Sequence, residues 1–299
     1  MEDFSAGHIS DEEARKVIID LNKEIATKEI RFYAGVSYRH LMVLKNGAAK
    51  FSNLEKSEIV PPHDIIGREI LPFLPQMKEP VLTLMKESQR LLKDHPVNHA
   101  REAKGLPPAN SIWLWGQGRS PRMITLKERF GLDGYVISAV HLIKGIGILA
   151  GLEAVEVPGA TGYFDTNYGG KVQYALRGLE EKDLVYLHVE APDEAGHMGN
   201  LRLKIEAIEA FDEKVVGAVL GGMKRFERHK VLVLPDHPTP LSLRTHVADP
   251  VPYAIYSNEG ATPSARRKKF DEVSAGQSGI SIERGFELIE RFLSPCCAC

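Results

Sequence analysis

Short apolar runs alternate with longer helical segments through the second half of the chain, and this alternation restricts the fold most. Strands are expected near residues 111–115, 134–138, 153–157, 184–189, 231–234 and 252–256. Helices are expected near residues 138–150, 168–179, 201–225 and 280–293. Because alternating strands and helices are typical of parallel sheets covered by helices, the sequence predicts an α/β core.

One of these runs, at residues 184–189, ends in a group of titratable side chains. The stretch LVYLHVEAPDEAGH passes from an apolar strand through Pro192 to Asp193 and His197. Ligands of open α/β sheets bind beyond the carboxyl ends of the strands. A first helical turn would place Asp193 and His197 on one face, where they could hold one ion. An Asp after a proline is also a common helix cap, and alone the pair would favour that interpretation.

A second strand ends in the same chemistry. In KVLVLPDHPTPLSLRTH an apolar run is followed by Pro235, then by Asp236 and His237, and a proline-containing loop leads to His246. Carboxylate and imidazole ligands together suit Zn or Mn. The candidate ligands exceed what one tetrahedral ion uses, so they indicate a two-metal centre, the usual device for holding a phosphoryl group during transfer. The candidate ligands are Asp193, His197, Asp236, His237 and His246.

Several long motifs resemble one known family. The segments DFSAGHIS, PPHDIIG, VISAVHLIKGIG, VEVPGATGYFDTNYGGK, APDEAGH and DHPTPLSLRTHVADPVP look like the archaeal-type, cofactor-independent phosphoglycerate mutases of the alkaline phosphatase superfamily, and the resemblance extends to about Leu293. It implies an alkaline-phosphatase-like parallel-sheet core with a smaller inserted α+β domain, two divalent metal ions (Mn, Zn, Co or Mg) and no organic cofactor. It further implies that Asp193, His197 and His246 hold one metal and that Asp236 and His237 hold the other.

The chain departs from this family at its beginning. The family starts with a core strand that ends in a metal-binding Asp, followed by a Ser nucleophile, whereas DFSAGHIS resembles a segment beyond both. Ser111 and Ser120 flank a different, Trp-containing motif. The sequence therefore reads as a member that lacks its amino-terminal part and first core strands. Either the product is truncated or a second polypeptide supplies them, and we expect the chain alone to be inactive.

Motifs and turn residues divide the chain into three parts. Residues 1–110 are expected to form the inserted domain, with a capped amphipathic helix at 10–28, paired strands at 31–38 and 41–44, and a helix at 80–92. The Pro- and Gly-containing stretch 94–110 reads as a connection. Residues 111–293 form the core, and residues 294–299 are expected to be a flexible tail. That tail holds all three cysteines, Cys296, Cys297 and Cys299.

Phosphate and carboxylate groups of the substrate require cations or fixed polar groups. The candidates are Arg39, Arg119 and Lys144, with His63 and Asp64 from a loop after two prolines. Solvated surface charges and an ordinary turn are the competing interpretations. The family commonly has an Asp at the position of His141, and this exchange places the substrate preference in question.

Composition limits the partners. The 38 Lys and Arg nearly balance the 40 Asp and Glu, so no strong field favours nucleic acid or anionic membranes. No apolar run approaches the roughly 18 residues of a spanning helix. The acidic amino terminus is unlike a signal peptide, so a cytoplasmic location is expected.

The resemblance implies interconversion of 3-phosphoglycerate and 2-phosphoglycerate through a phosphoserine by the complete enzyme. Three alternatives stay open: a relative that phosphorylates homoserine, a metal-dependent phosphohydrolase, and a non-catalytic protein that binds metal or phosphoglycerate. Assays with each substrate and for free phosphate separate them.

Overall fold

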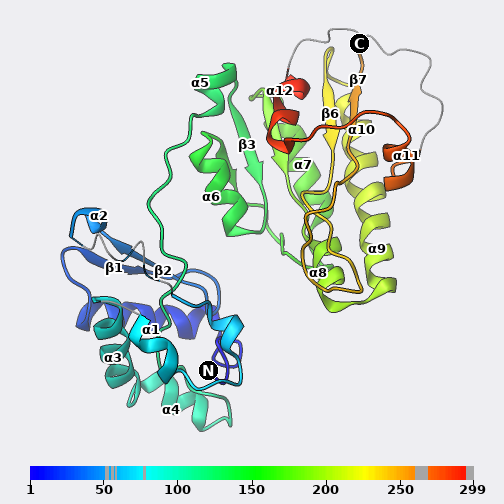
Figure 1. Ribbon diagram of the computed structural model, residues 1–299. Helices are drawn as coiled ribbons and strands as arrows, with labels where there is room; N and C mark the ends of the chain where they lie inside the picture. Colours follow the sequence, from blue (N-terminus) through cyan, green and yellow to red (C-terminus); the bar gives the residue numbers. More distant parts are fainter. Residues whose placement is uncertain (51–53, 55–56, 58, 77–78, 260–268, 294–299) are drawn as a thin grey trace. The chain divides into compact units, whose positions relative to one another are not determined.

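The chain forms two compact units, Met1–Ser120 and Pro121–Cys299 (Figure 1). The computed structural model describes residues 1–50, 54, 57, 59–76, 79–259 and 269–293. The cysteine-containing tail, 294–299, lies outside the described residues. The division after Ser120 falls later in the chain than the boundary expected at residue 110.

Unit 1 contains helices packed beside a two-stranded sheet. Its regular elements are α1 (Asp11–Glu24), β1 (Ile30–Tyr33), β2 (Leu41–Leu44), α2 (Gly47–Lys50), 3-10 turns at Pro62–Ile65 and Leu71–Gln76, α3 (Val81–Leu92) and α4 (Pro96–Glu102). Strands β1 and β2 are antiparallel, with Ile30 opposite Leu44. The capping box predicted for α1 is present, because Ser10 and Glu13 exchange hydrogen bonds. One face of α1, including Val17 and Leu21, is buried in the unit's core.

Two predictions for unit 1 are wrong. The stretch 94–110 is not a simple connection, because the His95 ring accepts a hydrogen bond from the Val97 N–H and begins α4. Residues 111–115 do not form a strand. Their polar groups bond to side chains and loops instead: the Ile112 N–H donates to Ser88 Oγ and the Trp113 ring N–H to the Val60 carbonyl.

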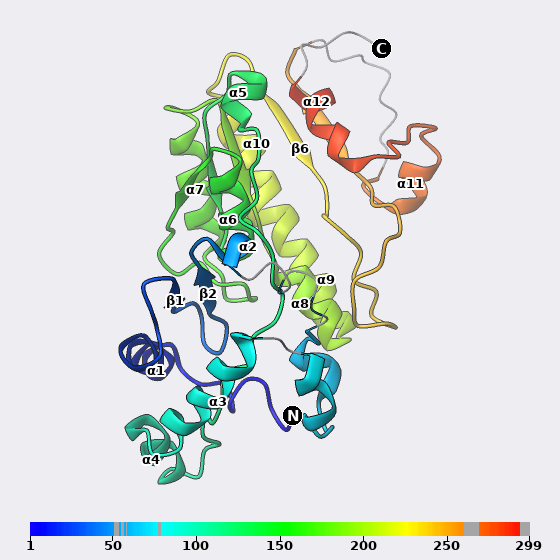
Figure 2. The ribbon, with the colours of Figure 1, turned by 60° about the vertical axis from the view of Figure 1, so that its left-hand side comes forward.

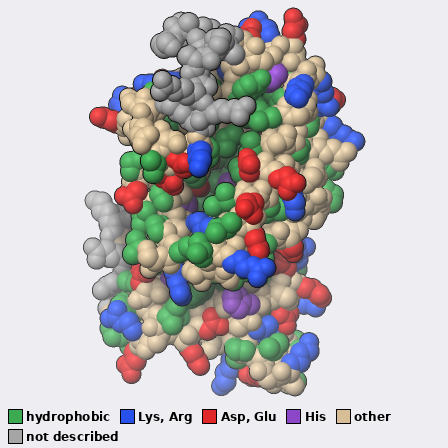
Figure 3. Space-filling model, turned by 90° about the vertical axis from the view of Figure 1, so that its right-hand side faces the viewer, with side chains coloured by type: hydrophobic (Ala, Val, Ile, Leu, Met, Phe, Trp, Pro, Cys, Tyr) green, Lys and Arg blue, Asp and Glu red, His purple; other side chains and the backbone are tan. Residues whose placement is uncertain are grey.

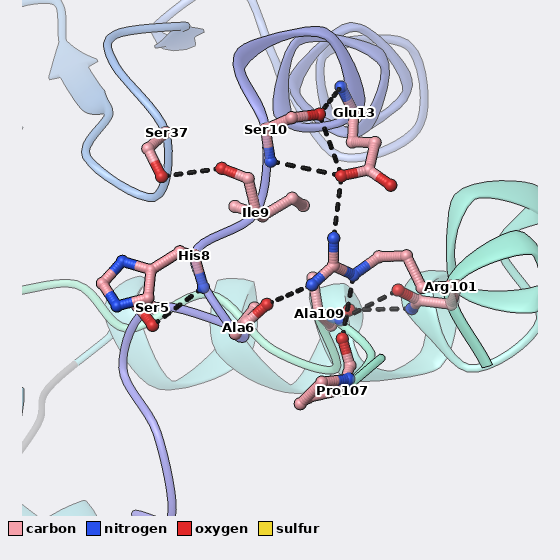
Figure 4. A network of polar contacts seen from close by, with 12 residues as sticks. Ser5, Ala6, His8, Ile9, Ser10, Glu13, Ser37, Arg101, Pro107 and Ala109 are labelled. Atoms are coloured by element: carbon pink, nitrogen blue, oxygen red, sulfur yellow. Dashed lines mark hydrogen bonds and ion pairs between the residues drawn. The ribbon is translucent and has the colours of Figure 1, made fainter. Parts of the chain in front are cut away.

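A buried arginine joins three segments of unit 1 (Figure 4). The Arg101 side chain on α4 is 2% exposed. Its Nη1 donates to Glu13 Oε2 at 2.7 Å, its Nε donates to the Pro107 carbonyl at 2.8 Å, and its Nη2 donates to the Ala6 carbonyl. Because the guanidinium donors are satisfied within the unit, this charge fixes the amino-terminal loop against α1 and α4.

The sheet of unit 2 is parallel, as predicted. Strands β3 (Gly134–Ile137), β4 (Glu153–Val155) and β5 (Leu184–Leu187) lie in the order β4-β3-β5. Helix α5 (Leu126–Phe130) precedes β3, α6 (His141–Leu149) connects β3 to β4, and α7 (Tyr168–Gly178) connects β4 to β5.

Helices α6 and α7 cover opposite faces of this sheet (Figure 1). Gly147 of α6 lies against Val136, and Gly178 of α7 lies against Tyr135. Since successive strand residues point to opposite faces, these contacts place the two helices on opposite sides of β3. At both positions a Cβ would meet side-chain carbons at 2.6 Å or closer, so glycine permits the close approach.

The rest of unit 2 contains the second strand that is followed by candidate metal ligands. Its elements are α8 (Ala191–Met198), α9 (Leu201–Phe211), a π-helical turn at Asp212–Gly217, α10 (Ala218–Met223), β6 (Lys230–Val233), β7 (Ala254–Ser257), α11 (Glu272–Gly276), a 3-10 turn at Gly285–Glu287 and α12 (Leu288–Leu293). Helix α8 leads directly into α9 (Figure 2). The helix expected over 280–293 is therefore confined to its final part.

The sheet prediction needs one correction. Strands β6 and β7 form a separate antiparallel pair, with Lys230 opposite Ser257. Within the described residues, β5 is hydrogen-bonded only to β3, and β6 only to β7. The two strand ends that carry the candidate ligands thus belong to two separate ladders, and in the described part of the chain β5 and β6 each keep one unpaired edge.

The surface of unit 2 includes several apolar strand side chains. Tyr186 of β5 is 47% exposed, and Ile255 and Tyr256 of β7 are 42% and 49% exposed. Figure 3 shows hydrophobic side chains at the surface between charged ones. No helix in the described part of the chain is long and apolar enough to cross a bilayer.

Candidate metal centre

Asp193 and His197 lie on the short helix that follows β5. Helix α8 begins at Ala191 with Pro192 in its first turn, and Pro is well tolerated there because the missing N–H has no helical partner. The spacing of four places both side chains on one face, with His197 Nε2 3.2 Å from Asp193 Oδ2. Asp193 is 24% exposed and His197 is 37% exposed, so both are within reach of solvent and ligands.

The loop after β6 brings imidazoles to the same place. Potential ligand atoms of Asp193, His237 and His246 all lie within 4.8 Å of one another. His246 Nε2 lies 3.4 Å from Asp193 Oδ1 and 3.0 Å from His197 Nε2. Asp236 is more peripheral: its Oδ2 lies 3.5 Å from His237 Nε2 and its side chain is 55% exposed. Two strand ends thus converge on a compact carboxylate and imidazole cluster.

Hydrogen bonding to the backbone sets the tautomer of His197. Its Nδ1 lies 3.0 Å from the Arg244 carbonyl, which only accepts, so Nδ1 carries the proton. Nε2 then presents its lone pair toward His246 and Asp193. This arrangement, with one ring nitrogen bonded to a carbonyl and the other directed at the candidate ligands, is typical of metal-binding histidines. Arg244 adopts a left-handed backbone, φ 54°, a strained conformation at the residue that holds the ring.

Thr239 organises the interior side of the cluster. It is 4% exposed, and its hydroxyl donates to Asp193 Oδ1 and lies 3.4 Å from His237 Nδ1. Its carbonyl accepts a hydrogen bond from Lys204 Nζ at 2.8 Å. Burial lowers the pKa of Lys204, and the nearby Asp193 carboxylate opposes that effect. Neither Thr239 nor Lys204 was predicted from the sequence as a site residue, because neither lies in a spacing that marks a ligand.

His188 and Lys171 also lie beside this cluster and were not predicted as site residues. His188 follows β5 and is half-buried; burial lowers its pKa, with Asp236 acting in the opposite direction. Lys171 of α7 is 1% exposed and donates to the His188 carbonyl at 3.3 Å. Burial lowers the pKa of Lys171, against the influence of Glu190. The only sequence signal for His188 was its position between the apolar run and APDEAGH.

The predicted substrate-binding residues are divided between the units. Arg39, His63, Asp64 and Arg119 are exposed residues of unit 1, and only Lys144 shares unit 2 with the metal cluster. The His63 ring packs against Phe4 and Trp115, with centroid distances of 4.2 and 5.3 Å. The Arg39 guanidinium lies over Tyr38. Lys144 is 12% exposed and pairs with Glu156 at 2.6 Å. His141, the first residue of α6, is exposed.

Comparison with known proteins gives a consistent result. The model of the metalloenzyme superfamily matches residues 28–278. A probable 2,3-bisphosphoglycerate-independent phosphoglycerate mutase of Geobacter sulfurreducens is 51% identical over 98% of this chain and 72% of its own length. The 2,3-bisphosphoglycerate-independent phosphoglycerate mutase of Methanosarcina acetivorans is 47% identical over 97% of this chain and 72% of its own length.

Solved structures agree with the fold. The PH0037 protein from Pyrococcus horikoshii matches with a TM-score of 0.74 and 25% identity, over 91% of this chain and 65% of its own. The cofactor-independent phosphoglycerate mutase from Thermoplasma acidophilum matches with a TM-score of 0.58 and 22% identity, over 96% and 70% of the two chains. Superfamily membership and the cluster at Asp193 together imply divalent metals. With its parallel α/β core, its convergent carboxylate and imidazole cluster and these relatives, the chain belongs to the 2,3-bisphosphoglycerate-independent phosphoglycerate mutases of the metalloenzyme superfamily.

Proposed function

We propose that this chain forms the metal-binding part of an enzyme that interconverts 3-phosphoglycerate and 2-phosphoglycerate through a phosphoserine. The observation that carries the proposal is the convergence of Asp193, His237 and His246 from two different strand ends, with His197 in contact. Two divalent cations, of Mn, Zn, Co or Mg, would supply electrostatic stabilisation for a phosphoryl group in transfer. The mutase names of the relatives support this choice of reaction.

The residues divide into two ligand sets. Asp193, His197 and His246 form the more complete one, since the ring of His197 is fixed by the Arg244 carbonyl and Asp193 by Thr239. Asp236 and His237 form the second, which is short of ligands. We therefore infer that a segment outside this chain's residues completes the second set and supplies the serine.

Two observations support such a segment. The chain spans about 72% of the length of the relatives it matches. Within the described residues, β5 and β6 each keep an unpaired edge. A strand that paired with either edge would end close to Asp193 or Asp236, where a further carboxylate and a hydroxyl would meet the cluster.

The substrate's anionic groups would be held by the cations proposed from the sequence. Arg39 and Arg119 of unit 1 can offer guanidinium forks to phosphate or carboxylate oxygens, and Lys144 of unit 2 a point charge. His63 and Asp64 of unit 1 would offer fixed polar groups to the substrate. Lys144 would have to exchange its present pair with the exposed Glu156 for a substrate oxygen.

Metal binding is tested first. Substitution His197→Ala should lower the Mn or Zn content measured by elemental analysis, because other groups do not replace a lost ligand. The matched control is His141→Ala, which removes an exposed imidazole of the same unit. Equal metal content in the two variants would count against His197 as a ligand.

The reaction is tested by reconstitution. The chain alone should leave 3-phosphoglycerate unchanged in the presence of Mn. Addition of the amino-terminal segment of a close relative, fused or as a separate peptide, should produce 2-phosphoglycerate, and changing that segment's serine to Ala should abolish it. Conversion by the unsupplemented chain would contradict the proposal. Parallel assays with homoserine and ATP, and for free phosphate, examine the kinase and phosphohydrolase alternatives.

A further inference from the structure

Ser138 and His188 form a hydrogen-bonded pair at the carboxyl ends of β3 and β5. Ser138 Oγ lies 3.1 Å from His188 Nδ1 and accepts a hydrogen bond from the Val140 N–H at 3.0 Å. Ser138 is 3% exposed, whereas His188 is half-buried. The His188 N–H donates to the Ile137 carbonyl at 2.8 Å, which holds this residue against the end of β3. The serine hydroxyl therefore lies on the buried side of the imidazole ring.

This environment selects one tautomer of His188. If Ser138 donates its proton to Nδ1, the Val140 N–H, the hydroxyl and the ring nitrogen are all satisfied. If Nδ1 instead carried the proton and donated to Ser138, both donors would share one oxygen and the hydroxyl proton would need another acceptor. Leaving a buried donor unsatisfied is costly, so the first arrangement is favoured. His188 then carries its proton on Nε2.

The polarity of His188 is thus opposite to that of its neighbour His197. His197 keeps its proton on Nδ1, bonded to a carbonyl, and presents a lone pair. His188 presents an N–H. It directly follows β5, five residues before Asp193 of α8, so it lies at the strand end from which α8 carries candidate ligands. The carboxylates of Asp236 and Asp193 and the side chains of Lys171 and His237 act on it there. A neutral imidazole N–H can donate to an anion, but it cannot ligate a cation through the same nitrogen.

We propose that His188 is a hydrogen-bond donor for a phosphoryl oxygen held at the metal centre, and that Ser138 is the residue that positions it. The inference rests on the proposed function and deepens it, because it assigns a side chain that binds the tetrahedral oxyanion and does not ligate the metal. The Lys171 side chain donates to the His188 carbonyl and so helps to hold this residue in place.

The tautomer is tested by NMR on the full chain labelled with ¹⁵N-histidine, without metal and at pH 8. Long-range proton–nitrogen correlations should show His188 as the Nε2–H form, assigned by the signal lost in His188→Gln. In Ser138→Ala the same ring should show both tautomers. A wild-type Nδ1–H form, or an unchanged tautomer in Ser138→Ala, would overturn the assignment.

Oxyanion binding is tested with inorganic phosphate and the Mn-loaded chain. His188→Phe should weaken phosphate binding by at least about tenfold, the loss expected for a hydrogen bond to a charged group, with unchanged Mn content. His188→Gln, which keeps an N–H at a similar reach, should bind phosphate nearly as the wild type does. The proposal would be overturned if His188→Phe bound phosphate as tightly as the wild type, or if the wild type bound no phosphate. Equal loss of Mn in His188→Phe and His188→Gln would overturn it as well. A chain that passes these tests but cannot be reconstituted as a mutase would refute the proposed reaction alone.

Discussion

Around Asp193 the positions of charged side chains depend on uncharged neighbours. Thr239 is buried, donates to the Asp193 carboxylate and, through its carbonyl, holds Lys204. The Arg244 carbonyl performs the corresponding role for His197. The candidate ligands could be predicted from sequence because each lies at or shortly after the end of an apolar run. Thr239 could not, since its contact with Asp193 depends on how the loop after β6 folds back.

Removal of the Thr239 hydroxyl should weaken metal binding without removing a ligand. Thr239→Val keeps the shape of the side chain but leaves Asp193 Oδ1 without its donor, so Mn affinity should fall by about 10- to 100-fold. Thr239→Ser should retain most of the affinity. Isothermal titration of the full chain with Mn measures both, and equal affinities in the two variants would show that the hydroxyl has no influence on the metal.

Arg101 should make the stability of unit 1 depend on acid pH. Burial disfavours the Glu13 carboxylate, but hydrogen bonds from Ser10 and the Arg101 charge outweigh it and lower the pKa of Glu13 below 4.5. A lowered folded-state pKa gives stability that is present above pH 4.5 and is lost as pH falls through the folded-state value. Arg101→Met should lower the free energy of unfolding by about 3 kcal/mol at pH 7. The variant should also lose less stability than the wild type as the pH falls.

Urea unfolding at pH 7 and pH 3.5 measures both effects. Arg90→Met is the matched control, because the Arg90–Glu87 pair on α3 is exposed and should contribute less than about 1 kcal/mol. Equal losses of stability in Arg101→Met and Arg90→Met would show that the buried Arg101 contacts stabilise unit 1 no more than an exposed ion pair does.

At the level of elements, the sequence predicted the helices and strands whose formation depends on neighbouring residues in the chain. Helices α1, α3, α6 and α7 and the strands β3 to β6 occur where apolar periodicity, caps and turn residues place them. The segment 111–115 has a strand-like pattern, yet its apolar side chains pack into unit 1 and its polar groups find side-chain partners. The antiparallel direction of β7 is also invisible in sequence, because pairing direction depends on the path of the connecting loop.

The close approach of α6 to β3 yields a paired test on one helix. A Cβ at Gly147 would lie 2.5 Å from Val136 Cγ1, so Gly147→Ala should destabilise unit 2 by about 1–3 kcal/mol. A Cβ at Gly145 meets nothing within 4 Å, so Gly145→Ala should stabilise by up to about 1 kcal/mol through helix propensity. Thermal unfolding compares them, and shifts of the same sign would contradict the packing described for α6.

At the scale of the whole molecule, unit 1 has a core of its own. Its two hydrophobic clusters, around Leu21 and around Val81 and Met85, draw all their members from residues up to 114 in the described part of the chain. Ile112 and Leu114 contribute to both clusters. Turn residues alone predicted a boundary at residue 110, whereas the packing of Ile112 and Leu114 extends unit 1 beyond that residue.

This difference can be measured with two fragments. Residues 1–120 should fold alone, with helical circular dichroism and a cooperative urea transition. Residues 1–110 should be less stable, because Ile112 and Leu114 are removed and the Trp113 bond to the Val60 carbonyl is lost. Equal stability of the two fragments would place the boundary at 110.

The π-helical turn between α9 and α10 has a consequence for how this chain tolerates insertions and deletions. Such a turn holds one residue more than an α-helical turn, and each residue of an α-helix rotates the chain by about 100°. Val215 within the turn and Gly222 beyond it both face α7, where Gly222 lies against Leu176. Deletion of a single residue, such as Lys214, would let α9 continue as an ordinary helix with Gly222 still facing α7, whereas the undeleted chain wound as a regular α-helix would turn Gly222 away from that contact by about 100°. The π turn thus absorbs one extra residue and keeps the face of α10 that carries Gly222 against α7.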